Sequence, residues 1–133
     1  MKALTLTQPW ATLVMAGRKT YETRAWRTDY RGALAIHAAR SMGIEACAAA
    51  RAFGLEPEEL PRGAVLGEVL LADCRPVEEV SVGAQERAYG DYSGGRFAWR
   101  LFAPCAYEVP IAAGGSLGLW NWDKPSILGP KER

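Results

Sequence analysis

The chain has 133 residues, of which 49% are hydrophobic and 23% charged, and its formal net charge is +1. This length and apolar content fit one folded domain and exclude a disordered chain. A net charge near zero argues against sequence-blind coating of DNA, but it leaves room for one local anionic ligand.

The charge is unevenly distributed along the chain. Between positions 18 and 40 lie six basic residues, Arg18, Lys19, Arg24, Arg27, Arg31 and Arg40, and two acidic ones, Glu22 and Asp29. Subtracting these from the 16 basic and 15 acidic residues of the whole chain leaves 10 against 13. The segment therefore carries +4 and the remainder −3, so an anionic ligand is expected at this segment.

The cysteine and histidine pattern excludes a metal centre and predicts an intracellular protein. Cys47, Cys74 and Cys105 are far apart, and His37 is the one histidine, so no zinc spacing exists and no cofactor is expected. Scattered cysteines of odd number indicate buried thiols in a reducing cytosol, so a cytoplasmic location is predicted. The apolar run after Met1 is too short for a signal peptide, and no stretch reaches the ~20 apolar residues of a membrane span.

The N-terminal residues predict a short strand followed by a helix. Alternating residues favour a strand over 3–7, and Pro9 suits the first helical turn, with Thr7 or Gln8 as its cap. Gly17 is expected to end this helix in a left-handed conformation. One helical stripe toward the core is predicted from Trp10, Leu13, Val14 and Gly17.

Two strands and a second helix are expected next. Period two over residues 20–24 puts Thr20, Glu22 and Arg24 on one strand face, and residues 33–38 form an apolar strand. Ser41 is a plausible cap for a helix over 44–53 that Gly54 closes. Its residues in helical phase are Ile44, Cys47, Ala48, Arg51, Ala52 and Leu55.

The second half of the chain is rich in strands. Residues 64–74 are apolar on both faces, as in a central strand, and residues 77–89 predict one or two short helices. Residues 91–95 form a turn, and shorter strands are expected over 97–102, 107–111 and 117–122. Several short strands with helices between them indicate the α+β class, built as a small mixed β-barrel. A single domain over 1–123 and a C-terminal tail over 124–133 are predicted.

The row formed by Lys19, Glu22 and Arg24 is the main candidate for chemistry. Two cations beside a carboxylate favour its ionised form, which suits orienting a ligand or accepting a hydrogen bond. An anion could lie on Lys19, Arg24 and Arg31, and a base could stack on Trp10, Trp26 or Tyr30. The competing interpretation is an exposed strand face with an ion pair worth under about 1 kcal/mol.

Other candidates have equally simple structural interpretations. Trp10 lies in phase with a core stripe, whereas Trp26 lies in a turn and is the better stacking candidate. His37 is more typical of a hydrogen-bonded core histidine than of a catalyst, and Glu68 interrupts an apolar strand. The residues Trp99, Trp120 and Trp122 are expected in the core and at its rim.

Most enzyme patterns are missing from the sequence. There is no G-x-S-x-G, no Gly-rich phosphate loop and no pair of histidines. Lys19 with a carboxylate partner remains as an acid/base or nucleophilic pair, provided that the lysine is desolvated.

The stretch 8–40 resembles the signature of the ASCH (activating-signal-cointegrator homology) domain, a Q-P-W-A helix followed by G-x-K-x-x-E-x-R, an aromatic residue and R-G. The matching residues are Gln8, Pro9, Trp10, Ala11, Gly17, Lys19, Glu22, Arg24, Trp26, Arg31 and Gly32. The resemblance continues through residues 67–74, 97–101 and 117–120, so it covers nearly the whole chain.

This resemblance implies a PUA-like β-barrel with helices around it and a cleft where the G-x-K-x-x-E-x-R face meets the first helix. It also implies nucleic-acid binding, chiefly of RNA, in a cationic cleft. A nucleotide-like ligand or single-stranded DNA is included among the expected partners, whereas a membrane is not. The expected ligand-binding residues are Gln8, Trp10, Lys19, Glu22, Arg24, Trp26, Arg31 and His37.

A compact branch of the family looks like an amidohydrolase of acetylated cytidine, with a lysine at the position of Lys19, a threonine three residues later and a distant glutamate. Glu22 occupies the threonine position here, and Glu68, Glu78, Glu79 and Glu86 are open alternatives for the glutamate. Ribonuclease activity is also associated with the family. The leading hypothesis is therefore an RNA- or nucleotide-binding module. The alternatives are a small hydrolase with Lys19 and Glu22 as catalytic residues, and a purely protein-binding domain.

Overall fold

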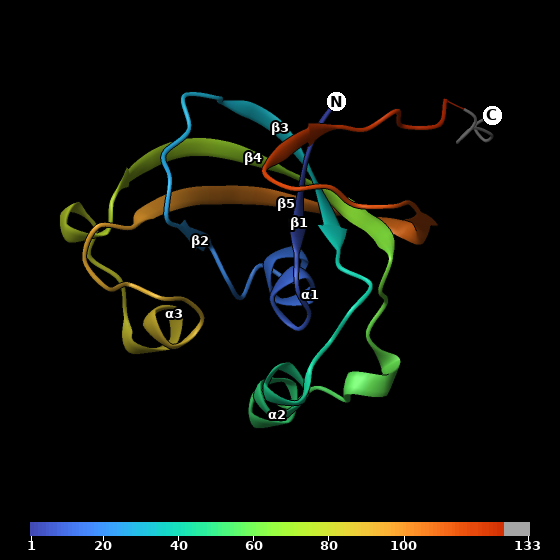
Figure 1. The fold of residues 1–133 in the computed structure, drawn as a ribbon, viewed down its shortest axis with the longest axis horizontal. Coiled ribbons are helices and arrows are strands. Elements are labelled where there is room, and N and C mark those ends of the chain that lie inside the picture. Colours follow the sequence, from blue (N-terminus) through green and yellow to red (C-terminus); the bar gives the residue numbers. More distant parts are fainter. Residues whose placement is uncertain (127–133) are drawn as a thin grey trace.

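A single curled sheet of six strands forms the framework of the computed structural model, which describes residues 1–126 (Figure 1). The strand order is β2-β5-β4-β3-β1-β6, and the one parallel pair among these neighbours is β1 with β3. The strands are β1 (Lys2–Leu6), β2 (Tyr21–Arg24), β3 (Gly32–Ala38), β4 (Ala64–Pro76), β5 (Phe97–Ala112) and β6 (Leu119–Asn121). The sheet wraps into an open half-barrel, so the predicted α+β class and barrel type are confirmed.

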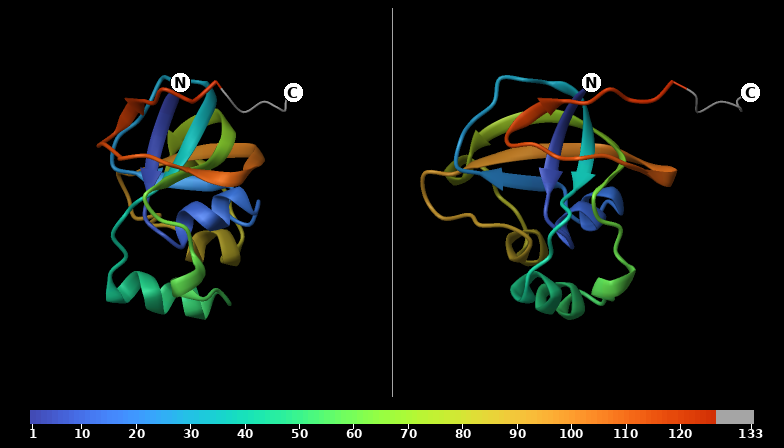
Figure 2. Two further views of the ribbon diagram at one scale, coloured as in Figure 1. Left: turned by 90° about the vertical axis from the view of Figure 1, so that its right-hand side faces the viewer. Right: turned by 45° about the vertical axis from the view of Figure 1, so that its right-hand side comes forward.

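Three short α-helices and two 3₁₀ turns surround the sheet. They are α1 (Trp10–Met15), α2 (Ile44–Ala52), α3 (Ala84–Ala88), η1 (Pro57–Glu59) and η2 (Val77–Glu79). Helix α1 packs against β3, β4 and β5, whereas α2 and α3 lie farther from the sheet (Figure 2). One or two short helices are predicted within residues 77–89, and η2 and α3 confirm this prediction. None of the helices within residues 1–126 is long and apolar enough to cross a membrane.

The first helix ends as its sequence predicts, but it begins later than expected, because Pro9 is its N-cap and Trp10 its first residue. The Gln8 side-chain oxygen accepts a hydrogen bond from the Thr12 backbone N–H at 3.0 Å, which satisfies one of the free donors of the first turn. Gly17 follows the helix with a φ of +76°, the left-handed conformation in which glycine carries no steric penalty. Both ends of α1 are therefore fixed by local chemistry.

The main core lies between the sheet and α1. Inward-facing residues of β1, β3, β4 and β5 alternate along each strand and meet Ala11 and Val14 of α1. Trp99 is completely buried, Trp122 is buried in a second, smaller cluster, and Trp120 packs against that cluster half-buried. This distribution matches the predicted core and rim positions of the three tryptophans.

Three expectations about the elements are wrong. The strands expected over 97–102 and 107–111 form one strand, β5, which continues through Ala103 at a φ of +54°, and its register with β4 shifts at three places. The strand bends at these irregularities, and the sequence pattern indicated a break between two strands at this bend. Gly43, not Ser41, precedes α2, and Ala50 is the one buried residue of that helix. The residues predicted in helical phase do not mark a buried face, because Ala50 lies outside that set and Ile44, its first member, is 89% exposed.

The cysteines differ from the expectation of three buried thiols. Cys74 is buried, Cys47 is half-buried and Cys105 is exposed on β5. The predicted C-terminal tail, residues 124–133, lies outside the described residues apart from 124–126.

Gly67 lies where the backbones of β4 and β5 come close together, and its replacement tests the packing there. A Cβ on Gly67 would lie 2.7 Å from the Ala106 Cα and would also clash with the Cys105 carbonyl oxygen. Because these are backbone atoms, Gly67→Ala should lower the free energy of unfolding by about 1–3 kcal/mol. Urea unfolding followed by circular dichroism measures this loss. Gly114→Ala is the control, since a Cβ there meets nothing within 4 Å; equal stability of the two variants would contradict the prediction.

Candidate functional site

The candidate site lies at the open side of the half-barrel, between β1 and the edge strand β2. These two strands are not neighbours in the sheet, so no backbone ladder joins them. The Arg24 guanidinium spans the gap, because its Nη2 donates a hydrogen bond to the Thr5 carbonyl oxygen at 2.9 Å. A side chain therefore bridges the sheet where its backbone pairing stops.

Two adjoining hollows occupy this opening, with volumes of about 320 and 290 Å³. They share the lining residues Trp10, Glu22, Thr23 and Arg96. The first is completed by Thr5, Leu6, Thr7 and Arg24, and the second by Ala88, Tyr89, Gly90 and Asp91. We call the two hollows together the β1–β2 cleft.

Glu22 connects the charged groups of this cleft. Its carboxylate accepts a hydrogen bond from Arg24 Nε at 2.9 Å and lies 3.6 Å from Lys19 Nζ. The Glu22 side chain is 14% exposed, so its charge is largely withdrawn from solvent and depends on these cations. The structure brings Lys19, Glu22 and Arg24 together, as their strand spacing predicts.

Lys19 lies beneath the cleft and not at its surface. The residue is 2% exposed, and its Nζ donates a hydrogen bond to the Tyr89 carbonyl oxygen at 2.8 Å. Burial lowers the pKa of the Lys19 ammonium below its ordinary value of 10.5, against the opposing attraction of Glu22 and Glu86. Lys19 therefore acts on the cleft through the groups that it holds, Glu22 and Tyr89.

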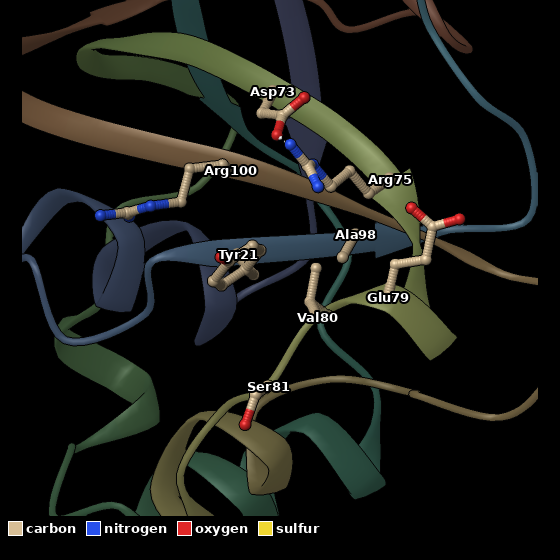
Figure 3. A pocket seen from close by; sticks show the side chains of 8 residues that line it. All are labelled: Tyr21, Asp73, Arg75, Glu79, Val80, Ser81, Ala98 and Arg100. Atoms are coloured by element: carbon tan, nitrogen blue, oxygen red, sulfur yellow. Dashed lines mark hydrogen bonds and ion pairs between the residues drawn. The ribbon is translucent and has the colours of Figure 1, made fainter.

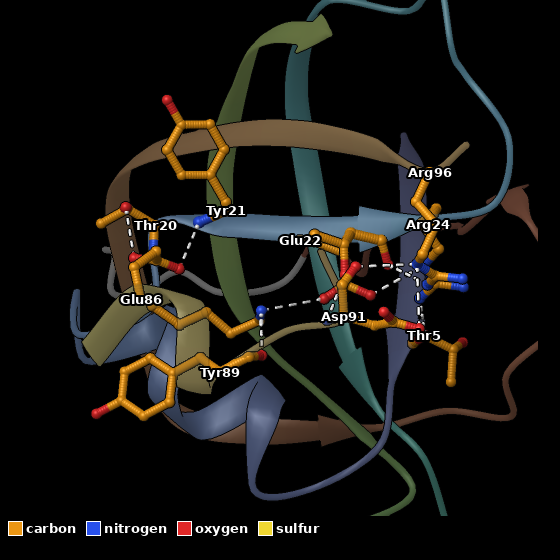
Figure 4. Close-up of polar contacts among 11 residues, drawn as sticks. Thr5, Thr20, Tyr21, Glu22, Arg24, Glu86, Tyr89, Asp91 and Arg96 are labelled. Atoms are coloured by element: carbon orange, nitrogen blue, oxygen red, sulfur yellow. Dashed lines mark hydrogen bonds and ion pairs between the residues drawn. The ribbon is translucent and has the colours of Figure 1, made fainter. Parts of the chain in front are cut away.

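Of the four downstream glutamates left open by the sequence, Glu86 is the one that contacts the chain between Lys19 and Glu22. Its carboxylate accepts hydrogen bonds from the Thr20 backbone N–H at 2.9 Å, the Thr20 hydroxyl at 2.8 Å and the Tyr21 N–H at 3.2 Å (Figure 4). Glu86 thus docks α3 on the free edge of β2. The other three lie elsewhere: Glu68 pairs with Lys124 and Tyr107, Glu78 accepts from the Gly95 N–H, and Glu79 lines a hollow on the outer face of the sheet.

Arg96 and Asp91 form a wall of the cleft that the sequence analysis missed. Arg96 Nη2 donates to the Thr23 carbonyl oxygen at 3.2 Å, and Arg96 Nε lies 3.6 Å from the Asp91 carboxylate. Figure 4 shows both side chains beside Glu22 and Arg24. They lie about 70 positions farther along the chain, and only the pairing of β2 with β5 brings them here. The sequence predicts a turn over residues 91–95, but it does not predict that this turn lies beside β2.

The two candidate stacking tryptophans occupy different environments. Trp10 lines both hollows of the cleft, and its ring centroid is 5.5 Å from that of Phe53 and 6.4 Å from that of Tyr89. Trp26 is 38% exposed, packs edge-on against Trp99 at 4.8 Å and lines neither hollow. The structure therefore places the aromatic surface of the cleft at Trp10.

The remaining predicted residues lie away from the cleft opening. Arg31 donates to the Thr28 and Tyr30 carbonyl oxygens and faces Asp73 at 3.8 Å, so it does not join Lys19 and Arg24. Gln8 is fully buried, and its amide donates to the Pro61 carbonyl oxygen at 2.7 Å. His37 is 2% exposed between the Thr5 hydroxyl and the Ala113 carbonyl oxygen. These contacts give Gln8 and His37 supporting roles behind the cleft wall.

The arrangement can hold a planar, polar ligand. Trp10 offers an aromatic face, Arg24 and Arg96 offer N–H donors, and Glu22 offers an acceptor. Among the residues that line the cleft, Arg24 and Arg96 balance Glu22 and Asp91, and the buried Lys19 beneath them brings the local charge to 3 − 2 = +1. Within the described part of the chain, no group of three histidine, cysteine or acidic residues could hold a metal ion.

Solved structures with the same fold are known. The crystal structure of an ASCH protein from Zymomonas mobilis is 18% identical, with a TM-score of 0.52 over 84% of this chain and 72% of that one. A tyrosine-to-phenylalanine variant of it matches at 18% identity and a TM-score of 0.52, covering 84% of this chain and 74% of that one. A serine-to-alanine variant matches at 20% identity and a TM-score of 0.50, with shares of 84% and 72%. A search of curated proteins found no match.

These structural matches establish the fold. The family assignment comes from the sequence, because the family model for the ASCH domain matches residues 4–111. That range contains most of β1, all of β2 to β4, all three α-helices and nearly all of β5, and with them every residue that lines the β1–β2 cleft. The chain therefore belongs to the ASCH domain family.

Proposed function

We propose that the β1–β2 cleft binds one nucleotide of a single-stranded RNA. The observation that carries this proposal is the convergence of Trp10, Arg24, Arg96 and Glu22 on one hollow of nucleotide-sized volume. Membership of the ASCH family, a PUA-like family often linked to RNA binding, supports the choice of ligand class. A cytoplasmic location, which the cysteine pattern predicts, would give the cleft access to RNA.

In this proposal the base stacks on Trp10. The ring packs against Phe53 and Tyr89, so it presents a rigid surface that loses little entropy when a ligand binds. Stacking of a base on an aromatic side chain is worth about 1–3 kcal/mol and tolerates any base. Trp10 therefore supplies affinity without sequence preference.

Polar recognition comes from the residues around the ring. Arg24 and Arg96 each use one amino group on a backbone carbonyl oxygen, which fixes the guanidinium planes. Their remaining N–H groups can donate to base carbonyls or to a phosphate, and Glu22 can accept from a base amino group. Because the cleft carries a local charge of only +1, hydrogen bonding and stacking outweigh bulk electrostatics, and the salt dependence of binding should be modest.

Replacing Trp10 tests the stacking surface. Trp10→Leu should weaken binding of a labelled RNA octamer by about 5- to 150-fold, the equivalent of one lost stacking contact. Fluorescence anisotropy with the octamers of A, C, G and U measures this loss, and circular dichroism checks the fold.

The matched control is Trp26→Leu, which removes the other partly exposed tryptophan, one that does not line the cleft. We expect octamer affinity to stay within twofold of the wild type. A loss at Trp26 with none at Trp10 would refute the location of the site. DNA octamers of the same sequences measure how far the cleft discriminates against single-stranded DNA.

A second candidate function, hydrolysis of a modified nucleoside or of RNA, is favoured by one observation. Lys19 is buried beside Glu22, and a lysine whose pKa is lowered becomes available as a neutral base or nucleophile. In this alternative Lys19 and Glu22 are the catalytic pair. Release of acetate from acetylated cytidine, or cleavage of labelled RNA, by the wild type but not by Lys19→Met would establish it, whereas no turnover across a nucleoside panel would leave the binding function.

The pKa of Lys19 is itself testable. We expect it below 10.5, and Glu22→Gln should lower it further, because removing the nearby negative charge leaves the burial penalty less opposed. An NMR titration that follows the Lys19 side-chain signals measures both values. Glu45→Gln, at an exposed position of α2, should leave the pKa of Lys19 unchanged. A pKa of Lys19 at or above 10.5 would contradict the prediction.

The same shift predicts a pH dependence of stability. Between the lowered folded-state pKa of Lys19 and 10.5, the unfolded chain binds more protons than the folded one, so the free energy of unfolding rises with pH. Below that window the full cost of burying the charged lysine remains. The difference in urea-unfolding free energy between wild type and Lys19→Met should therefore move in favour of the wild type as pH rises through the window. A difference that is constant with pH would contradict the assignment.

A further inference from the structure

A third hollow, separate from the two that form the β1–β2 cleft, lies on the outer face of the sheet. Its volume is about 310 Å³. It is lined by Tyr21, Asp73, Arg75, Glu79, Val80, Ser81, Ala98 and Arg100 (Figure 3). We call it the outer groove. It shares no lining residue with the cleft, but Tyr21 of the groove immediately precedes Glu22 of the cleft, so β2 contributes to both sites.

The strand register explains why this groove exists. Tyr21, Arg100 and Asp73 form one row across β2, β5 and β4, and Thr23, Ala98 and Arg75 form the next. The small side chain of Ala98 leaves the space between the larger members of both rows unfilled. Residues 79–81, at the end of η2 and in the loop that follows it, form the opposite wall. The hollow is therefore built from one face of the sheet and one wall of the β4–β5 connection.

The arginines of the groove are held in place by other groups. Arg75 Nε donates to Asp73 Oδ2 at 2.6 Å, and Arg31 Nη2 lies 3.8 Å from the same carboxylate. Arg100 Nη1 donates to the Leu101 carbonyl oxygen at 2.9 Å, and the Arg100 guanidinium lies 5.5 Å from the centre of the Tyr21 ring. Within residues 1–126, Nε and Nη2 of Arg100 have no hydrogen-bond partner. These groups remain available to a ligand.

The groove can meet an anion through its arginines although its lining charges balance. Arg75 and Arg100 stand against Asp73 and Glu79 among the lining residues, 2 − 2 = 0, and Arg31, which does not line the groove, adds one positive charge beside Asp73. Asp73 already pairs with Arg31 and Arg75 and accepts a hydrogen bond from the Cys74 backbone N–H. Its negative charge is therefore partly compensated and repels an anionic ligand less. Glu79 is exposed at the rim, where its charge opposes an anion. An aromatic ring beside several guanidinium groups is typical of surfaces that follow a single-stranded nucleic acid.

We propose that the outer groove is a phosphate-binding subsite for a second nucleotide of the strand whose first nucleotide occupies the β1–β2 cleft. This inference rests on the proposed function of the cleft. It assigns Arg75 and Arg100 to a phosphate of the RNA backbone, and Tyr21 to the adjoining ribose or base. Mononucleotides would use the cleft alone, and longer RNA would use both sites.

Two substitutions with opposite expected signs test the subsite. Arg75→Gln removes a cation, so it should weaken binding of the RNA octamers by roughly three- to fivefold at 0.1 M salt and reduce the salt slope by about 0.7. Glu79→Gln removes the opposing charge and should strengthen octamer binding. The affinities of the four nucleoside 5′-monophosphates should stay unchanged in both variants, because neither residue lines the cleft. Both residues are exposed, so the fold should tolerate the changes.

Arg40→Gln is the matched control, since it removes an exposed arginine that lines neither site. It should change octamer affinity less than Arg75→Gln does, and an equal loss would show that net charge alone is responsible and overturn the subsite.

Octamer binding that depends on Trp10 but responds to neither Arg75→Gln nor Glu79→Gln would also overturn the subsite while leaving the cleft function intact. If the Trp10 indole NMR signal does not move with any octamer or monophosphate, the cleft function fails. Opposite responses of octamer affinity to the two groove variants would then still support phosphate binding in the groove.

Discussion

The Glu22 carboxylate is the constraint on which the rest of the site depends. It sits between Lys19 and Arg24, and through Arg24 it joins the edge strand β2 to the Thr5 carbonyl oxygen of β1. No backbone ladder links these strands, so the opening of the half-barrel is defined by charged side chains instead of by sheet hydrogen bonds. A fully closed barrel would have no such opening, and therefore no cleft.

The buried lysine shows that this arrangement is not optimised for stability. Desolvating the Lys19 ammonium opposes folding, and a single hydrogen bond to the Tyr89 carbonyl oxygen together with one carboxylate offsets only part of that cost. Lys19 nevertheless ties three elements together: the strand β2 through Glu22, the α3–β5 connection through Tyr89, and α1 through its position 6.0 Å from the Trp10 ring. Burying Lys19 therefore costs stability but fixes the geometry of the cleft, because each of these elements contributes residues to the lining of the cleft.

How much of this was predictable depends on how far apart in sequence the partners lie. The period of two over residues 20–24 is a local property, so Glu22 and Arg24 were correctly assigned to one strand face, with Lys19 beside them. Arg31 and Trp26 belong to the same basic segment, but a turn before β3 directs Arg31 toward Asp73 on β4, and no local pattern encodes that direction. Arg96, Asp91 and Glu86 reach the site only through long-range pairing and docking, which composition and spacing do not reveal. The helical stripe of α2 was misleading because alanines favour a helix whether or not it is packed.

The connection between β4 and β5 unites these observations, because one segment helps to form both proposed sites. Residues 79–81 wall the outer groove, and residues 88–91 with Arg96 wall the cleft. Helix α3 between them has no buried residue, so its position rests on polar contacts, above all those of Glu86 with the free edge of β2. An exposed strand edge would otherwise invite pairing with another chain, and the Glu86 carboxylate occupies the Tyr21 N–H of β2 and the Thr20 N–H just before it. The contacts of Glu86 therefore protect this edge and also fix the wall of the outer groove relative to the wall of the cleft. The stability of the β2 edge is linked in this way to the shape of both proposed sites.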